Sequence, residues 1–245
     1  MKVAATIEAR MGSTRLPGKV LLPAVGKPLL EHLVERLRRV RQLQDIIVAT
    51  TEKTKDNPIV RLSEKIGVNC FRGSEDDVLE RILGAAHAQG ADIIVAITGD
   101  CPLIDPEMVE LCIERYLSSK VDFLANFLPP SYPLGMATQV LPTKILDQVA
   151  TLTQDPVDRE HVTIYIYRHP EKYRILNVSA PPELTRPTLR LTLDTVKDYE
   201  VIRTIFEALY PKKKEFTLAD TLNFLDAHPE IASINADVKQ KVPPR

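Results

Sequence analysis

The sequence predicts an α/β fold built around a mostly parallel sheet. Apolar runs of strand length alternate with segments whose apolar residues recur at helical spacing, from the N-terminus to about residue 120. Two of these runs, residues 45–51 and 92–98, are apolar almost throughout, which is typical of strands buried on both faces of a parallel sheet. This repeated strand–helix order requires right-handed crossover connections, so we expect neighbouring strands to point the same way.

The first half of the chain supplies the regular part of this pattern. Pro28 stands at the first turn of one helix, and Gly67 and Gly90 follow the last apolar positions of two others, where helices commonly end. We predict strands at residues 3–7, 45–51, 68–71 and 92–98, and helices at residues 28–41, 59–66, 74–88 and 105–116.

The pattern changes after Lys120. Residues 121–141 hold three prolines and Gly135 without clear periodicity, so we predict a loop-rich passage. We then predict helices at 143–152 and 156–167, strands at 173–178 and 189–193, helices at 196–209 and 217–227, and a polar, frayed tail. Because strand–helix alternation resumes, we expect one domain over residues 1–245 with an inserted region at about 121–185.

Composition excludes several classes of protein. The formal net charge of the 245 residues is −1, so there is no global basic footprint for nucleic acid or for an anionic membrane. No segment approaches the roughly twenty apolar residues that span a bilayer. The 3 cysteines are too few and too scattered for a disulfide framework or a zinc site. We therefore expect a cytoplasmic protein that binds neither nucleic acid nor membrane.

One loop, residues 9–19, concentrates positive charge. It follows the first strand and carries Arg10, Arg15 and Lys19 together with two glycines and no acidic residue. Flexible backbone with free N–H groups and cations at the carboxyl end of a strand suits a polyphosphate. Its spacing matches neither a Walker loop nor a dinucleotide fingerprint. The alternative is a surface loop whose cations are only solvated.

Two carboxylates follow predicted strands. Asp100 comes after the strand at 92–98 and Asp194 after the strand at 189–193. Each has a simpler interpretation, Asp100 as a turn residue and Asp194 as the N-cap of the helix from 196. However, ligands of parallel α/β sheets bind outside the carboxyl ends of strands, where both would face the cationic loop. The arrangement predicts a site for a polyphosphate bound to Mg²⁺.

Several motifs together resemble the cytidylyltransferase family, which includes the synthetases that make CMP-sugar acids, and most resemble its spore coat polysaccharide biosynthesis branch. The resemblance runs from about Lys2 to Leu209. It implies a Rossmann-like nucleotide-diphospho-sugar transferase fold in which the inserted region serves dimerisation and acceptor binding. The motifs are Ala9-Arg10-Met11-Gly12-Ser13-Thr14-Arg15-Leu16-Pro17-Gly18-Lys19, Gly26-Lys27-Pro28-Leu29, Val48-Ala49-Thr50-Thr51, Phe71-Arg72-Gly73-Ser74, Ile97-Thr98-Gly99-Asp100-Cys101-Pro102 and Arg159-Glu160-His161-Val162-Thr163.

The resemblance also implies roles for individual residues. Those matching the grip on the triphosphate of CTP are Ala9, Arg10, Met11, Gly12, Arg15 and Lys19. Those matching contacts to the cytosine and ribose are Ala49, Thr50, Arg72, Gly73 and Ser74. The metal ligands would be Asp100 and Asp194, and catalysis would rest on Arg15, Lys19 and Asp100. The residues matching acceptor contacts are Gln139, His161, Tyr165 and Arg168.

The implied reaction is Mg²⁺-dependent transfer of CMP from CTP to a sugar acid or related acceptor, with release of pyrophosphate, by a homodimer. Two alternatives stay open: a nucleotidyltransferase that uses another nucleotide with a sugar phosphate or polyol phosphate, and a non-catalytic nucleotide-binding homologue. Two departures bear on the choice. Glu8 stands where the family commonly has an amide, and residues 134–140 are neutral where the branch usually has acids.

Overall fold

The structure of the chain, a computed structural model, describes residues 1–241. Its strands are β1 (Val3–Glu8), β2 (Pro23–Ala24), β3 (Lys27–Pro28), β4 (Asp45–Thr51), β5 (Asn69–Gly73), β6 (Ile93–Thr98), β7 (Phe123–Ala125), β8 (Gln139–Pro142) and β9 (Ile175–Asn177). Its α-helices are α1 (Leu29–Leu37), α2 (Asn57–Lys65), α3 (Val78–Ala88), α4 (Pro106–Leu117), α5 (Thr143–Leu152), α6 (Pro156–Glu160), α7 (Ile164–Arg168), α8 (Val196–Leu209), α9 (Leu218–Ala227) and α10 (Pro229–Ser233).

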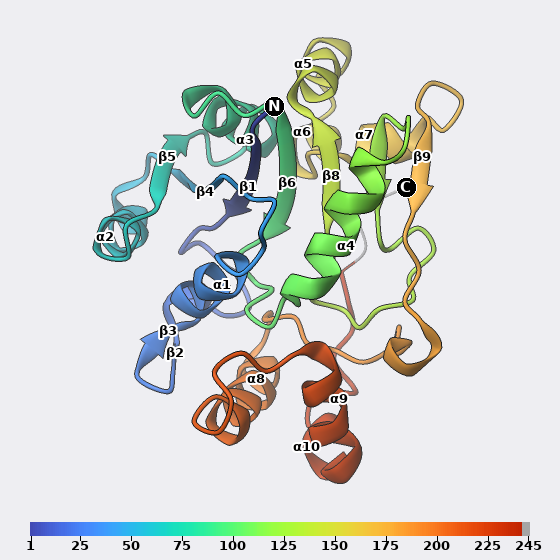
Figure 1. The fold of residues 1–245 in the computed structure, drawn as a ribbon. Coiled ribbons are helices and arrows are strands. Elements are labelled where there is room, and N and C mark those ends of the chain that lie inside the picture. Colours follow the sequence, from blue (N-terminus) through green and yellow to red (C-terminus); the bar gives the residue numbers. More distant parts are fainter. Residues whose placement is uncertain (242–245) are drawn as a thin grey trace.

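Seven strands form one sheet in the order β5-β4-β1-β6-β8-β7-β9 (Figure 1). Strand β8 runs antiparallel to both of its neighbours, and every other pairing in this sheet is parallel. The predicted α/β class with a mostly parallel sheet is therefore confirmed. The prediction of a loop-rich passage at 121–141 missed β7 and the start of β8, because these short strands pair only with residues far away in the sequence.

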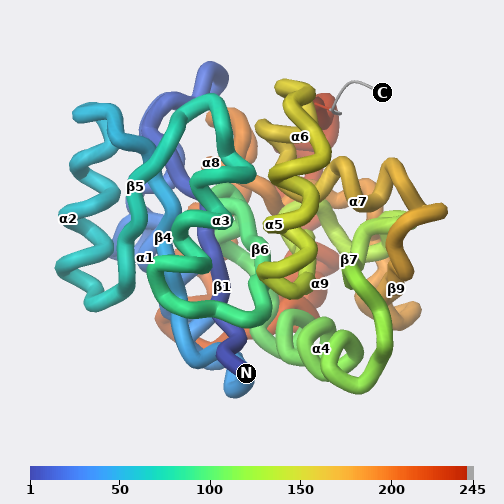
Figure 2. The backbone as a smooth tube through the Cα atoms, turned by 90° about the horizontal axis from the view of Figure 1, so that it is seen from above, coloured from blue at the N-terminus to red at the C-terminus, as the bar shows by residue number. Residues whose placement is uncertain are grey.

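Helices cover both faces of the sheet, and each face has its own core (Figures 1 and 2). Along β1, Val3, Ala5 and Ile7 face a core built with α1, α4, α8 and α9, whereas Ala4 faces a core built with α3, α5 and α7. Successive side chains of a strand point to opposite faces, so the same alternation fixes which polar residues at the end of β1 can face each layer.

The carboxyl ends of β1 and β6 point in one direction in Figure 1, toward the end of the molecule occupied by α8, α9 and α10. The chain beyond the sheet thus returns to the edge at which ligands of parallel sheets bind. No helix within residues 1–241 has the length and apolar character needed to cross a membrane.

Three predictions in the second half were wrong in detail. The helix expected at 156–167 is two short helices, α6 and α7, separated at residues 161–163. The segment 189–193 is not a strand of the sheet, although Arg190 forms an isolated parallel bridge with Leu134. The tail is not frayed as far as residue 241, because α10 and the segment after it pack back onto the domain.

Candidate active site

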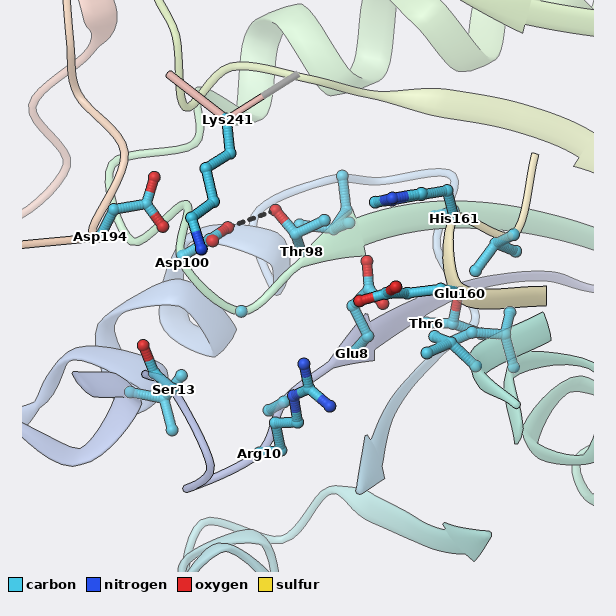
Figure 3. Close-up of a pocket in the computed structure, with 18 of the residues that line it drawn as sticks. Thr6, Glu8, Arg10, Ser13, Thr98, Asp100, Glu160, His161, Asp194 and Lys241 are labelled. Atoms are coloured by element: carbon cyan, nitrogen blue, oxygen red, sulfur yellow. Dashed lines mark hydrogen bonds between the residues drawn. The ribbon is translucent and has the colours of Figure 1, made fainter. Parts of the chain in front are cut away.

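A cleft of about 480 Å³ opens at the carboxyl ends of β1 and β6, on the side of the sheet that α3 covers (Figure 3). Its walls come from the loop after β1, the end of β6, one side of α3, the turn between α6 and α7, Asp194, and the last two described residues, Gln240 and Lys241. Elements from both halves of the chain therefore build a single site.

The loop after β1 is held by backbone hydrogen bonds. The carbonyl of Met11 accepts the N–H groups of Ser13 and Gly18, both at 3.0 Å, and the N–H of Met11 donates to the buried carboxylate of Asp56 at 2.6 Å. Gly18 has φ +69°, a conformation that glycine adopts without strain. The loop therefore curls back on itself, and Arg10, Arg15 and Lys19 all line the cleft.

Lys19 joins the two carboxylates predicted from the strand ends. Its Nζ lies 2.8 Å from Oδ2 of Asp100 and 3.0 Å from Oδ1 of Asp194. Asp100 also accepts a hydrogen bond of 2.5 Å from the hydroxyl of Thr98. Its carboxylate thus binds side chains, and the interpretation of Asp100 as a simple turn residue is not supported.

Asp194 is enclosed by cations. Arg15 Nη2 lies 3.1 Å and Arg190 Nη2 lies 3.3 Å from its Oδ2 atom, and Arg190 is also paired with Asp198 at 3.2 Å. The N-cap of α8 is Thr195, whose hydroxyl accepts from the N–H of Asp198, so the interpretation of Asp194 as the cap is wrong. We call Arg15, Lys19, Asp100 and Asp194 the loop end of the cleft.

These pairs govern the ionisation of the loop end. Burial alone would raise the pKa of Asp100, but the Lys19 ammonium, with the Thr98 and Cys101 donors, holds it below the usual value. Burial would likewise lower the pKa of Lys19, and the two carboxylates raise it instead. Lys19 and Asp100 therefore both carry their charges at neutral pH.

The side chains at the loop end are suitable ligands for a magnesium ion. Two carboxylates converge on one point, and their oxygens are the hard ligands that Mg²⁺ prefers. Within residues 1–241 there is no group of three or more histidine, cysteine or acidic side chains that could hold a metal. Mg²⁺ commonly keeps water and takes one or two carboxylates together with substrate phosphates, so two protein ligands are sufficient.

The other end of the cleft, which we call the helix end, consists of Thr6, Glu8, Arg81 and Glu160 beside α3 and α6. Strand alternation turns Thr6 and Glu8 toward α3, opposite to Ile7. In Figure 3 the side chains of Glu8 and Glu160 both extend into the cleft, from β1 and from the end of α6. Burial, and then the charge of Asp100, raise the pKa of Glu8 to about 7.

Polar atoms at the helix end lack partners. The Thr6 hydroxyl is buried, and no hydrogen-bond partner lies within residues 1–241. The Arg81 guanidinium donates through Nη1 to the carbonyl of Ser74, while its buried Nε has no acceptor in the same part of the chain. Unsatisfied buried polar groups are costly, which makes this end of the cleft a candidate for a polar ligand.

The turn between α6 and α7 enters the cleft in a strained conformation. Val162 has φ +50°, which is unusual for a β-branched residue. The turn brings His161, Val162 and Thr163 to the wall of the cleft, and the Thr163 hydroxyl donates to the side-chain carbonyl of Gln139. Strain of this kind persists at functional sites when the surrounding structure supports it.

The cleft gathers many of the residues expected from the sequence, but not all. Those lining it are Ala9, Arg10, Gly12, Arg15, Lys19, Asp100, Gln139, His161 and Asp194. Those outside its lining are Met11, Ala49, Thr50, Arg72, Gly73, Ser74, Tyr165 and Arg168.

Side-chain contacts explain the residues that lie outside. Thr50 is fully buried, and Arg72 donates to the carbonyls of Thr51 and Lys53, each at 3.0 Å. Tyr165 stacks on His169 with ring centroids 4.1 Å apart, and Arg168 lies 3.4 Å from the carboxylate of Asp158. Gly73 and Ser74 approach the cleft only indirectly, through Arg81.

Sequence reasoning missed Arg81, Glu160, Gln240 and Lys241. A signal for Arg81 was present, because it occupies the same helical face as Val78 and Ile82, both of which line the cleft. An arginine on the buried face of an amphipathic helix is uncommon without a function. The tail residues had no such signal, because nothing local indicates where the chain returns.

The neutral segment noted in the sequence supports the loop end through its backbone. The N–H of Leu134 donates to Leu189 and the N–H of Leu191 to Leu134, at 2.9 and 2.8 Å. Gly135 has φ +101°, and a Cβ there would lie 2.5 Å from the carbonyl oxygen of Leu191. Two residues later, Leu193 donates to the carbonyl of Asp100 at 2.8 Å. This close packing places Asp194 beside Asp100.

Comparison with known proteins shows which family and which relatives this chain resembles. The family model described as Cytidylyltransferase matches residues 4–225. The chain is 33% identical to the spore coat polysaccharide biosynthesis protein SpsF of Bacillus subtilis, over 93% of this chain and 95% of that protein. It is 31% identical to 3-deoxy-manno-octulosonate cytidylyltransferase of Trichlorobacter lovleyi, over 85% of this chain and 93% of that protein.

Two solved structures agree in fold. A cytidylyltransferase from Leptospira borgpetersenii superposes with a TM-score of 0.89 at 34% identity and covers 99% of each chain. The CMP:2-keto-3-deoxy-manno-octonic acid synthetase complexed with CTP gives a TM-score of 0.65 at 21% identity, over 84% of this chain and 98% of that one. The second likeness supports the α/β fold with its mostly parallel sheet.

Proposed function

The chain belongs to the cytidylyltransferase family of nucleotidyltransferases, and we propose that it transfers CMP from CTP to a hydroxyl group of a sugar acid, with Mg²⁺ as cofactor and pyrophosphate as the second product. The observation that carries this proposal is the contact of Lys19 with both Asp100 and Asp194 beside the cationic loop. It brings cations for phosphate and carboxylates for a metal to the same point.

In the proposed reaction, the acceptor oxygen forms a bond to the α-phosphorus of CTP while the bond from that phosphorus to the β-phosphate oxygen breaks. Arg10, Arg15 and Lys19 bind and orient the phosphates and stabilise the charge that develops on the leaving pyrophosphate. Positioning and charge stabilisation account for most of the catalysis in such transfers. Asp100 and Asp194 would hold Mg²⁺, which supplies further neutralisation of phosphate charge when bound.

The acceptor binds, in this proposal, at the helix end. The hydroxyl proton must leave as the new bond forms, and the carboxylates of Glu8 and Glu160 are available there to accept it. For a carboxylate on the acceptor, Arg81 is the cation at the helix end, because Arg168 lies against Asp158 outside the lining. The similarity to the 3-deoxy-manno-octulosonate cytidylyltransferase of Trichlorobacter lovleyi supports a sugar acid as acceptor.

The relatives support a proposal for the biological setting. The similarity to SpsF supports a role in supplying activated sugars for polysaccharide synthesis. We further propose that the protein is a homodimer through residues 121–185, a region that exposes Leu152 at 57%. Light scattering at two protein concentrations tests this assembly, and a monomer at both would refute it.

The activity is tested by pyrophosphate release. Purified protein is incubated with MgCl₂, each of the four nucleoside triphosphates in turn, and a panel of 2-keto-3-deoxy sugar acids. We expect release with CTP and one acceptor, and none after chelation of the metal or with CTP alone. Release with a different nucleotide or with sugar phosphates only would replace this proposal by the related nucleotidyltransferase. No release under any condition would exclude an active enzyme of this kind.

A further inference from the structure

The segment 235–241 runs from the end of α10 to the cleft. Asn235 is buried and donates to the carbonyl of Arg190 at 3.2 Å and to the carboxylate of Asp198 at 2.8 Å. Five residues on, the side-chain carbonyl of Gln240 accepts a hydrogen bond of 2.7 Å from Arg190 Nη1. Two residues of the segment, Asn235 and Gln240, therefore form hydrogen bonds with the same buried arginine.

That arginine also orients a proposed metal ligand. Arg190 is 3% exposed, and the same guanidinium contacts Asp194 and Asp198. The position of the tail and the position of Asp194 thus depend on one side chain. A further contact of the segment is the ion pair between Lys197 Nζ and the carboxylate of Asp237 at 2.7 Å, which holds the middle of the segment on the surface of α8.

The tail ends its described course in the cleft. Lys241 lines the cleft, and Figure 3 shows its amine directed toward Asp100 from the side opposite the loop. Arg15 and Lys19 are already paired with carboxylates, whereas Lys241 has no ion-pair partner within residues 1–241. A triphosphate brings about four negative charges to this place, more than the loop cations neutralise after their own pairing.

We propose that residues 235–241 form a clamp on the loop end and that Lys241 binds a phosphate group of the nucleotide. This inference rests on the proposed function for the identity of that nucleotide. The lysine enters the cleft from the returning tail, whereas Arg15 and Lys19 enter it from the loop after β1, so that the triphosphate meets cations from two separate segments. The lysine ammonium is a compact charge at the end of a flexible side chain, which suits a contact with a phosphate group.

The test compares three variants by titration calorimetry with tripolyphosphate and with CTP in MgCl₂. Lys241→Met removes the charge and keeps the length, Lys241→Arg keeps the charge, and Lys239→Met makes the same change two residues away, where the side chain is exposed and outside the cleft lining. A lost charge-assisted contact weakens binding by about tenfold. We expect that loss for Lys241→Met, with a shallower salt dependence, and less than about threefold for the other two.

The outcomes separate this inference from the proposed function. Equal affinities for Lys241→Met and Lys239→Met overturn the inference even when the wild-type protein releases pyrophosphate. If the wild-type protein binds both ligands but releases pyrophosphate with no acceptor, the proposed function falls, and the affinity of Lys241→Met still decides the inference. If the wild-type protein binds neither ligand, the inference fails as well.

Discussion

The loop end and the helix end of the cleft differ in how their charged and polar groups are satisfied. At the loop end, Lys19 contacts two carboxylates and Asp194 contacts three cations. At the helix end, two carboxyl groups line the cleft, and the Thr6 hydroxyl and Arg81 Nε have no partner within residues 1–241. Both ends lie in the same cleft and contain a similar mixture of residue types.

The difference indicates whether the groups at each end of the cleft are held in place before the ligand binds. A paired network is rigid and keeps its groups in position before the ligand arrives, which favours stabilisation of a charged transition state. The ligand supplies the missing hydrogen-bond partners of the unpaired groups. A ligand without matching groups leaves them unsatisfied and binds more weakly, which favours selectivity. We therefore expect chemistry to depend most on the loop end and acceptor choice on the helix end.

The largest effect should come from Asp100→Asn at the loop end. The substitution keeps the size of the side chain but removes the charge that binds Lys19 and the proposed metal. We expect pyrophosphate release to fall by about 10³-fold, with an unchanged circular dichroism spectrum. Asp226→Asn, which removes an exposed carboxylate outside the cleft lining, is the control. A loss below about tenfold for Asp100→Asn would show that the loop end is not the centre of the chemistry.

A second test removes the cation that joins the two carboxylates. Lys19→Met leaves Asp100 and Asp194 without their shared partner, so we expect the free energy of unfolding to fall by about 2 kcal/mol in urea titrations without divalent metal. Millimolar MgCl₂ should recover part of that loss, because a cation can occupy the place of the ammonium. Lys213→Met, at an exposed pair with Asp220, should show neither effect. Insensitivity to MgCl₂ would contradict the proposed metal position.

At the helix end, Glu8→Gln should change how stability depends on pH. Burial, and then the charge of Asp100, raise the pKa of Glu8 from 4.5 to about 7, so the folded protein holds a proton that the unfolded chain releases near pH 4.5. The wild type therefore loses stability as pH rises from about 4.5 through 7. The variant should match it near pH 4.5 and exceed it by about 3 kcal/mol at pH 8. Parallel stability curves would refute the assignment.

The smallest effects should separate His161 from Arg168. His161 lines the cleft in the strained turn beside Val162, so His161→Ala should raise the KM for the acceptor about tenfold and leave the KM for CTP unchanged. Arg168 lies against Asp158, and Arg168→Lys should change either KM by less than about twofold. Steady-state kinetics with the acceptor found in the screen decides between them. The opposite pattern would restore Arg168 as the acceptor clamp.

The sequence predicted the first half of the fold well because its signals there are local. Apolar runs, helical spacing and glycines after helices gave β1, β4, β6 and α4 with small errors at the ends. The three short strands β7, β8 and β9 depend on pairing across the sheet, which local composition does not reveal. Of these, only β9 was expected, and its predicted bounds were too long.

The candidate site was predicted to a similar degree. Asp100 and the loop after β1 lie together as predicted, because the carboxyl ends of parallel strands share one edge of the sheet. Asp194 reaches the same cleft although the described residues just before it form no strand, and residues 72–74 at the end of β5 lie outside the lining. The residues missed come from a helix face, a turn with positive φ and a returning tail. Their positions depend on tertiary packing, as for Glu160 and Lys241, and no spacing in the sequence encodes that.

The close approach at Gly135 sets a limit on mutational tolerance. A Cβ at this position would overlap the backbone of residues 191–192, and backbone cannot move aside as the end of a side chain can. In a saturation scan, Gly135 should accept almost no replacement, although it does not line the cleft. Residue 137, whose side chain does not line the cleft, should accept many. A position that appears neutral by charge can therefore be among the least replaceable in the chain.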